Sequence, residues 1–273
     1  LSTLCTSPIL AFGTEEQKRR FVPLLARGRV LGGFGLTEPG AGSDAGATRT
    51  TAVREAGGYR LNGSKIFITH GGVGEVFVVA AATDRAAGTR GITSFIVTKE
   101  TTDRAAADRV GVGHAPELEP FTPGVRAGKK EDKMGWRASD TRELIFEDAI
   151  VPAENRLGEE GRGFSNFMQT LDSGRIGVAA LALGLAQGAL DHAVRYAGTR
   201  RQFGQPIGEF QGVRFALADI ATETEAARHL VYHAAWLRQN GRPFARAAAM
   251  AKLYASELAM RVTTRAVQIL GGV

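Results

Sequence analysis

The chain has 273 residues, 44% of them hydrophobic, so it can bury a sizeable core, and its length favours two domains. Its formal net charge of +6 suits either nucleic acid or phosphate-rich small molecules and does not choose between them. The one cysteine, Cys5, excludes an internal disulfide framework and cysteine-based metal sites, and it favours a cytoplasmic location. The chain begins without a signal-peptide pattern, and polar residues bracket the apolar run 178–190 too closely to predict a membrane span.

Residues 1 to about 30 are predicted to be helical, because Thr14 can cap a helix whose first turn is acidic and whose end lies near Gly28. Residues 31 to about 152 are predicted to be rich in β-strands, at 59–69, 76–82, 92–98 and 143–151. Turns are predicted at Asn62-Gly63, a strong hairpin signal, and at residues 88–91. The polar stretch 101–124 is predicted to be an irregular excursion at the surface.

From Gly161 onward, apolar residues recur at helical spacing. An element rich in Ala and Gly is predicted over 163–198, a second helix follows it, and a third covers 244–270 after a break at Gly241 and Pro243. The second helix has one stripe spaced for burial, made of Leu217, Ile220, Thr224, Ala227, Val231 and Ala234. We therefore predict three helices of an antiparallel bundle, which a fourth helix would close.

This order of elements predicts an α+β multidomain protein. The predicted domains are the end of an N-terminal helical domain (1–32), a middle antiparallel β domain (33–152) and an incomplete C-terminal helical bundle (153–273). No internal repeat or low-complexity tract in the sequence competes with this organisation.

The stretch LTEPGAGSDAG, residues 36–46, is a glycine-rich corner that two familiar motifs do not explain. The spacing of Gly40, Gly42 and Ala45 fits a loose dinucleotide-binding fingerprint, but the residues that follow predict strands where that fold needs a helix. The nucleophile-turn motif is not matched either, because Ala41 stands two residues before Ser43. The corner is therefore predicted to lie among antiparallel strands. Glu38 is expected to brace it rather than to act as an acid or base.

Four separated motifs form one pattern, in the order FGLTEPGAGSD (34–44), FITH (67–70), LDSGRIG (171–177) with TRRQFG (199–204), and QILGG (268–272). Together they resemble the acyl-CoA dehydrogenase family over nearly the whole chain, apart from extra residues around 101–124. The resemblance implies an N-terminal helical domain, a middle β domain and a C-terminal up-down four-helix bundle, usually assembled as a homotetramer. FAD would lie between the β domain and the bundle.

The resemblance also implies an activity in fatty acid metabolism. A glutamate would remove the α-proton of an acyl-CoA thioester, the β-hydrogen would leave as hydride to flavin N5, and an electron-transferring flavoprotein would collect the electrons. Two alternatives stay open: an acyl-CoA oxidase-like flavoenzyme, and a non-catalytic member of the same fold that binds DNA. The basic residues alternate with acids, which argues against nucleic acid as the partner.

By resemblance, one group of residues would bind FAD from its own subunit. Thr37 would donate to the pyrimidine end of the flavin, Thr69 would lie near N5, and Phe67, where relatives usually have Trp, would shield a ring face. The full group is Phe34, Leu36, Thr37, Gly42, Ser43, Phe67, Ile68 and Thr69. A second group would reach the adenosine end of FAD across a subunit boundary, namely Arg200, Phe203, Gln211, Gln268, Gly271 and Gly272.

The acyl-CoA substrate would contact Ser43, Asp172 and Arg175 by the same resemblance. No catalytic base is assigned within the chain. One branch of the family has its glutamate at the position of Gly174, which cannot act, and the commoner branch has it beyond the position of Val273. We therefore expect a fragment or partial chain that is inactive on its own.

Three further residues, Glu225, His229 and His233, recur every four positions on one helix face and suggest a metal site. The sequence offers no further ligand in a His-Glu-x-x-His arrangement, so no metal site is predicted. The three side chains are interpreted as part of a solvated or intersubunit helix face. His70 follows the presumed flavin contact and is expected to be structural.

Overall fold

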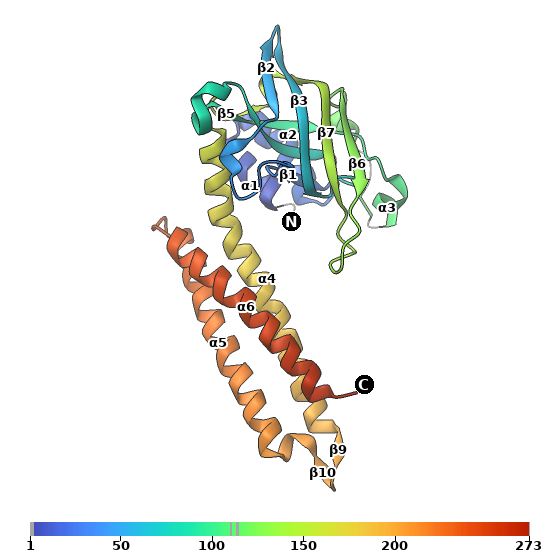
Figure 1. Ribbon diagram of the computed structural model, residues 1–273, viewed down its shortest axis with the longest axis vertical. Helices are drawn as coiled ribbons and strands as arrows, with labels where there is room; N and C mark the ends of the chain where they lie inside the picture. The colour runs from blue at the N-terminus through green and yellow to red at the C-terminus, as the bar shows by residue number, and fades with distance from the viewer. Residues whose placement is uncertain (1–2, 110, 113–114, 273) are drawn as a thin grey trace. The chain divides into compact units, whose positions relative to one another are not determined.

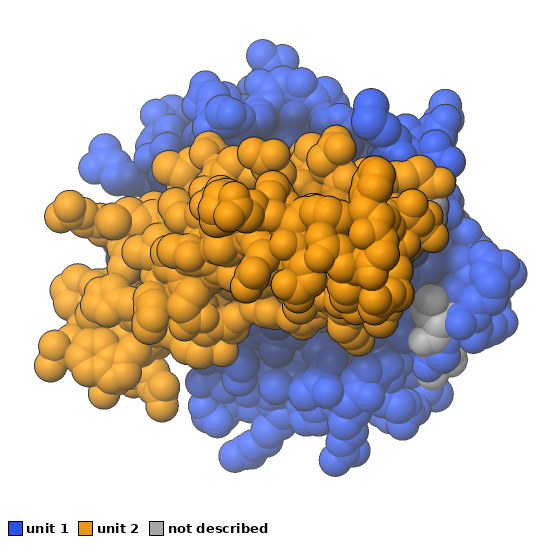
Figure 2. Space-filling view, turned by 90° about the horizontal axis from the view of Figure 1, so that it is seen from below, with its two compact units in different colours: residues 1–170 blue, residues 171–273 orange. Residues whose placement is uncertain are grey.

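The computed structural model describes residues 3–109, 111–112 and 115–272 (Figure 1). The chain divides into two compact units, Leu1–Thr170 and Leu171–Val273, which Figure 2 colours blue and orange. Each unit is described by itself below.

Unit 1 begins with two helices, α1 (Thr3–Phe12) and α2 (Glu15–Ala26). The predicted cap at Thr14 is confirmed as a capping box: its hydroxyl accepts from the Gln17 N–H at 3.2 Å, and the Gln17 side chain accepts from the Thr14 N–H at 3.0 Å. Cys5 of α1 is fully buried, and burial raises the pKa of its thiol to about 12.

The sheet of unit 1 has the order β6-β7-β3-β2-β4-β5-β8, with β1 beside β4. It is mixed rather than purely antiparallel, because β1 pairs parallel to β4 and Thr51 of β2 makes one parallel pair with Ala82. The strands are β1 (Gly32–Gly35), β2 (Thr51–Glu55), β3 (Gly58–Thr69), β4 (Val76–Ala82), β5 (Ile92–Thr98), β6 (Val125–Lys130), β7 (Thr141–Pro152) and β8 (Arg156–Leu157).

The two central strands are buried on both faces, which explains their unbroken apolar sequences. All residues of β4 and β5 are buried. On one face, Val76, Val78 and Ile96 join a core with residues of α1 and α2; on the other, Phe77 and Val79 join a second core with β3 and β7. The central strands are therefore covered by α1 and α2 on one face (Figure 1). On the other face they pack against side chains of β3 and β7, which belong to the same sheet.

The predicted hairpin at Asn62-Gly63 is wrong, because β3 runs straight through both residues. The turn lies instead at Gly57, which has φ of 85° and joins β2 to β3. Gly63 sits at a shift in the register between β3 and β7, and a Cβ there would lie 2.7 Å from the Thr50 hydroxyl. Asn62 uses its amide oxygen to accept from the Asp148 N–H at 2.9 Å.

In its described residues, the stretch 101–124 is not the irregular surface excursion that its polarity predicts. It contains helix α3 (Arg104–Arg109) and the short 3-10 helix η3 (Pro116–Leu118). Four of its apolar side chains are buried: Ala107 and Val112 pack with Val73, while Ala115 and Leu118 join the core under α1 and α2. The segment is thus attached to the domain by packing.

Unit 2 is made of α4 (Gly163–Thr199, whose first turns belong to unit 1), α5 (Gln211–Gln239) and α6 (Ala245–Leu270). Its core is rich in alanine, which lets the helices approach closely. The predicted stripe on α5 is confirmed: Ile220, Thr224, Ala227, Val231 and Ala234 are buried, and Leu217 is partly buried against the same core. Short connections make the three helices antiparallel, as an up-down bundle requires (Figure 1).

The expectation that no segment could cross a membrane needs correction for α4. By length and hydropathy alone, this helix is long and apolar enough to do so. The core helix of a bundle passes the same test, and Ile176, Ala179, Leu183 and Ala186 of α4 pack into the core of unit 2. Packing within unit 2 covers only part of the apolar surface of α4, since Val178, Leu181, Leu185 and Val194 are 41–49% exposed.

Candidate functional site

The glycine-rich corner forms a tight turn directly after β1. Glu38 and Ala41 exchange backbone hydrogen bonds of 3.0 and 3.1 Å, and the short 3-10 helix η1 (Ala45–Ala47) follows. Because no α-helix begins here, the N-terminal dipole that a dinucleotide fold uses is missing from this place, as the sequence predicts. The corner must hold a ligand, if at all, through its own hydroxyl and backbone groups.

A buried ion pair fixes the corner to β3. The Lys65 ammonium donates to Glu38 Oε1 at 2.6 Å and to the Leu36 carbonyl at 3.2 Å, and the side chains are 0% and 4% exposed. The Glu38 carboxylate also accepts from the backbone N–H groups of Arg49 at 2.7 Å and Thr50 at 3.0 Å. The expectation that Glu38 braces the loop is therefore confirmed.

The electrostatics of this pair follow from its burial. Burial lowers the pKa of Lys65 from 10.5 to about 8, although the Glu38 charge opposes the shift. For Glu38, burial raises the pKa, but the Lys65 charge and the hydrogen bonds from Lys65, Thr50 and Arg49 outweigh it. The pKa of Glu38 therefore lies below its ordinary value. At neutral pH both groups are charged.

The structure brings the end of β3 against the corner, so two predicted motifs that are far apart in the sequence meet. The Ile66 N–H donates to the Thr37 carbonyl at 2.9 Å. Gly33 of β1 lies against Thr69, because a Cβ on Gly33 would stand 2.8 Å from the Thr69 carbonyl oxygen. Residues 36–37 and 66–69 therefore form one surface within unit 1.

Phe67 has an unusual conformation at this surface. Its φ is 59°, a left-handed value that is uncommon for a bulky residue, and its ring is 61% exposed. The strand is irregular here, since the register with β7 shifts between Lys65 and Ile68. These two features do not by themselves mark a ligand site, since Trp136 has both, but beside the corner they favour a contact with a ligand.

Three hydroxyls at the surface are open to a ligand. Within the described residues, no hydrogen bond engages the side chains of Thr37, Ser43 or Thr69. Gly42 is exposed, and a Cβ there would meet nothing within 4 Å. The other predicted residues face the core: the Phe34 ring lies 4.3 Å from that of Phe167, Leu36 packs nearby, and Ile68 is buried.

In unit 2, the predicted substrate residues Asp172 and Arg175 form an ion pair on α4 and are partly exposed. Gly174 lies between them without a side chain. Asp172 and Arg175 are three positions apart and therefore lie on one face of the helix, as the sequence predicts.

The second group of predicted FAD residues lies at one end of unit 2 (Figure 1). Arg200 and Phe203 belong to the connection between α4 and α5, where β9 (Arg201–Gln202) and β10 (Gln205–Pro206) form a small hairpin, and Gln211 is the first residue of α5. Phe203 at its tip is 93% exposed, with φ of 51°. The remaining three, Gln268, Gly271 and Gly272, lie where α6 ends at the same end of the unit.

His70 and His229 have ordinary surroundings. His70 Nδ1 lies 2.9 Å from the Gly32 carbonyl, which supports a structural role. Glu225 pairs with Arg228 at 2.9 Å and with His229 at 3.5 Å. Among the residues that the structure describes, no group of three His, Cys, Asp or Glu side chains could hold a metal ion.

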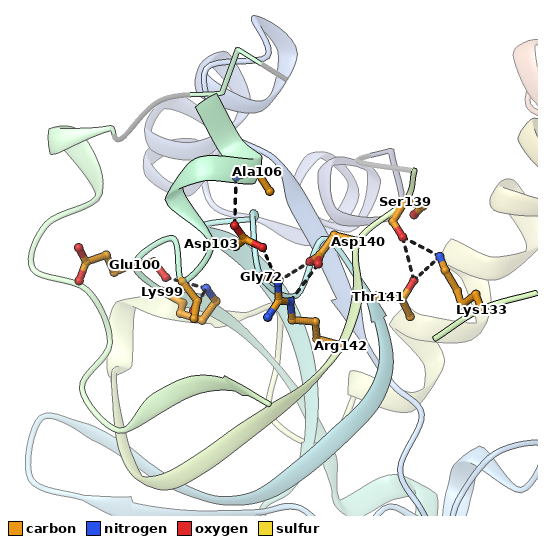
Figure 3. A network of polar contacts seen from close by, with 11 residues as sticks. Gly72, Lys99, Glu100, Asp103, Ala106, Lys133, Ser139, Asp140, Thr141 and Arg142 are labelled. Atoms are coloured by element: carbon orange, nitrogen blue, oxygen red, sulfur yellow. Dashed lines mark hydrogen bonds and ion pairs between the residues drawn. The ribbon is translucent and has the colours of Figure 1, made fainter. Parts of the chain in front are cut away.

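Two features of the site were missed by sequence reasoning. The sequence could have indicated that Lys65 is buried, because alternation along β3 places it on the same inward face as Tyr59 and Leu61. A charge on that face needs a buried partner. The polar network of Asp103, Asp140 and Arg142 behind the end of β3 has no such signal (Figure 3). Its members come from different segments of the chain.

Comparison with known proteins identifies the chain. The family model for the middle domain of acyl-CoA dehydrogenase matches residues 33–149, and that for the C-terminal domain matches residues 161–273. The chain is 53% identical over 271 residues to the short-chain specific acyl-CoA dehydrogenase of Megasphaera elsdenii and 46% identical to the mitochondrial short-chain enzyme of Rattus norvegicus. Each match covers 99% of this chain, but the chain spans only 65% and 61% of the length of those two proteins.

Solved structures agree. Butyryl-CoA dehydrogenase from Megasphaera elsdenii matches 99% of this chain and 65% of its own, with 52% identity and a TM-score of 0.88. A chain in a structure described as the electron transferring flavoprotein of Acidaminococcus fermentans matches 99% of this chain and 66% of its own, with 53% identity and a TM-score of 0.89. The chain belongs to the acyl-CoA dehydrogenase family.

Proposed function

We propose that the protein is an FAD-dependent acyl-CoA dehydrogenase that acts on short-chain acyl-CoA thioesters. The observation that supports this best is the surface where the end of β3 meets the corner, with its open hydroxyls and the exposed Phe67 ring. The names of the relatives, which are short-chain and butyryl-CoA enzymes, support the substrate class.

The donor set of this surface fits a flavin. A flavin needs hydrogen-bond donors at the polar edge of its ring and an apolar surface against one face. Thr37 and Thr69 supply hydroxyls without partners in the described chain, Phe67 supplies an exposed ring, and Gly42 and Ser43 offer an open backbone and a hydroxyl. When bound, FAD would supply the electron acceptor for removal of a β-hydrogen from the substrate.

The residues at the end of unit 2 are proposed to serve the adenosine end of FAD bound to another subunit. Arg200 suits a phosphate through its planar fork, and the exposed Phe203 ring suits an adenine face. This assignment rests on the resemblance and requires an oligomer, for which we propose a homotetramer. The domain boundaries at residues 32 and 152 likewise stay a prediction.

For the substrate, we propose that Ser43, Asp172 and Arg175 contact the acyl-CoA. Arg175 is held by Asp172, which fixes its direction on α4. We propose an electron-transferring flavoprotein as the redox partner, in keeping with the description of one similar structure, and a cytoplasmic location, in keeping with the lone thiol.

The test is an anaerobic titration with butyryl-CoA of the FAD-loaded protein at the full length of its relatives, following the absorbance of oxidised flavin. Bleaching by butyryl-CoA, with none by acetyl-CoA, is the expected result, because acetyl-CoA has no β-carbon to lose hydrogen. A protein that takes up FAD but is bleached by neither thioester would overturn the proposed activity.

We also predict that the 273-residue chain by itself dehydrogenates butyryl-CoA at a negligible rate. Gly174 has no side chain, and Asp172 is paired with Arg175, so this part of α4 presents no unpaired carboxylate to act as a base. Turnover assays on this chain, with added FAD and an artificial electron acceptor, check the prediction. A rate typical of the relatives would refute it.

Replacing Phe67 by glycine should separate stability from cofactor binding. The change relieves a left-handed φ and removes an exposed ring, so the free energy of unfolding should stay within about 1 kcal/mol of the wild type. The affinity for FAD should fall, because the ring face is lost. Trp136→Gly is the matched control: Trp136 has φ of 57° and is 56% exposed, and its loss should leave FAD affinity unchanged.

A further inference from the structure

The turn that follows β3, residues 70–74, is held from two sides at Gly72 (Figure 3). The Gly72 N–H donates to Asp140 Oδ2 at 2.6 Å. Its carbonyl accepts from the N–H groups of Thr102 at 2.9 Å and Asp103 at 3.2 Å. Both polar backbone groups of Gly72 are therefore committed, one to the start of β7 and one to the segment that leads into α3.

Arg142 joins these two sides. Its guanidinium donates from Nε to Asp140 Oδ1 at 2.9 Å and from Nη2 to Asp103 Oδ2 at 2.8 Å, and the side chain is only 14% exposed. It also packs against the turn, because a Cβ on Gly72 would stand 2.3 Å from Arg142 Nε. A planar fork between two carboxylates is a geometry that Arg provides and Lys does not.

The same contacts reach the end of β3. The His70 N–H donates to the Asp140 carbonyl at 2.7 Å, and Thr69 is paired with Thr141 in the sheet. His70 has φ of 64°, a conformation that needs support from its surroundings. A shift of Asp140 would therefore be transmitted through one peptide unit to Thr69.

The segment on the far side of Arg142 is itself anchored. Asp103 Oδ1 accepts from the Ala106 N–H at 3.0 Å and so caps α3. The Thr101 hydroxyl donates to the buried Glu75 carboxylate at 2.8 Å, and the Lys99 N–H donates to the Glu75 carbonyl at 2.9 Å. Residues 99–106 are thus tied to the neighbouring segments by hydrogen bonds at Lys99, Thr101 and Asp103.

We propose that Asp103 and Arg142 are positioning residues for the flavin, and that they act by fixing Thr69 through Asp140 and the 70–74 turn. The inference rests on the proposed function, because it takes Thr69 as the flavin contact. It assigns a role in cofactor binding to Asp103, which lies in the stretch 101–124 that the polarity of the sequence predicts to be a surface excursion.

The test is a double-mutant cycle on FAD affinity with Asp103→Asn, Thr69→Val and the double variant. Asp103→Asn keeps the size of the side chain and removes its charge. We expect it to weaken FAD binding by about 2- to 30-fold in the wild-type background. In the Thr69→Val background the same change should have little further effect, because the contact that it positions is already lost.

Glu147→Gln is the matched control, since Glu147 pairs with Arg126 on the exposed side of β7 and should not alter FAD affinity. Equal weakening by Asp103→Asn in both backgrounds, or no weakening, would overturn the proposal. If Asp103→Asn does not fold, the same cycle with Arg142→Lys decides by the same criteria. A wild-type protein that binds no FAD would instead overturn the proposed function.

Discussion

Lys65→Met is expected to lower the free energy of unfolding by about 3–5 kcal/mol, because it leaves the buried Glu38 carboxylate without its cation. The Glu38 oxygens would keep the N–H groups of Arg49 and Thr50, which compensate only in part. The double variant Lys65→Met with Glu38→Gln should recover some of the loss, because no charge is then buried. Urea unfolding of the wild type and the two variants at pH 7 measures these differences.

Arg60→Met provides the control for this experiment. Arg60 forms an equally short ion pair with Glu55, but both side chains are more than one third exposed, so water replaces the lost contact. We expect its free energy of unfolding to stay close to that of the wild type. If Lys65→Met behaves like Arg60→Met, the buried pair does not hold the corner.

The same lysine predicts how stability changes with pH. Its pKa is about 8 in the folded protein and 10.5 as an ordinary value, so between these limits the unfolded chain binds more protons. The free energy of unfolding should therefore rise with pH from about 8 to about 10.5 through this group. Lys65→Met should show a smaller rise, and an identical slope in both proteins would contradict the assignment. Lys99, whose pKa burial also lowers to about 8, contributes equally to both proteins.

Gly33→Ala is expected to have the second largest effect, a loss of about 1–3 kcal/mol in the free energy of unfolding. The added methyl would stand 2.6 Å from the Phe77 ring and 2.8 Å from the Thr69 carbonyl oxygen. Neither can move freely, because Gly33 is paired with Phe77 in the parallel register of β1 and β4. The strain falls on Thr69, so FAD affinity should decrease together with stability.

Gly184→Ala is the control with the opposite sign. Gly184 lies inside α4, and a Cβ there would meet nothing within 4 Å, so the variant should gain up to about 1 kcal/mol from helix propensity. Thermal or urea unfolding of both variants checks the pair of predictions. A Gly33→Ala protein as stable as the wild type would mean that β1 does not press against the end of β3.

Much of the fold could be predicted because local signals agree with the tertiary structure. The bounds of β4 and β5 follow from unbroken apolar runs between turn residues, and the stripe on α5 follows from helical spacing. The failures have one cause. Asn62-Gly63 is a strong local turn signal, but pairing with β7 along the whole of β3 overrides it.

The stretch 101–124 shows the same limit. Its composition is polar, yet Ala107, Val112, Ala115 and Leu118 find apolar partners that are distant in the sequence. No local pattern announces such contacts, nor the bridge that Arg142 makes between Asp103 and Asp140. At the site, the individual residues stay a prediction by resemblance, and the hydrogen bond that joins Ile66 to Thr37 could not be predicted.

The central claim is that the end of β3 and the corner together hold a flavin, and equilibrium titration of FAD tests it most directly. Thr37→Val and Thr69→Val should each weaken binding by about 2- to 12-fold, since each removes one hydrogen-bond donor. Thr51→Val, which removes a weak contact from β2 to the Asn62 carbonyl at 3.4 Å, should leave the affinity unchanged. Equal FAD affinity in the wild type and all three variants would contradict the claim.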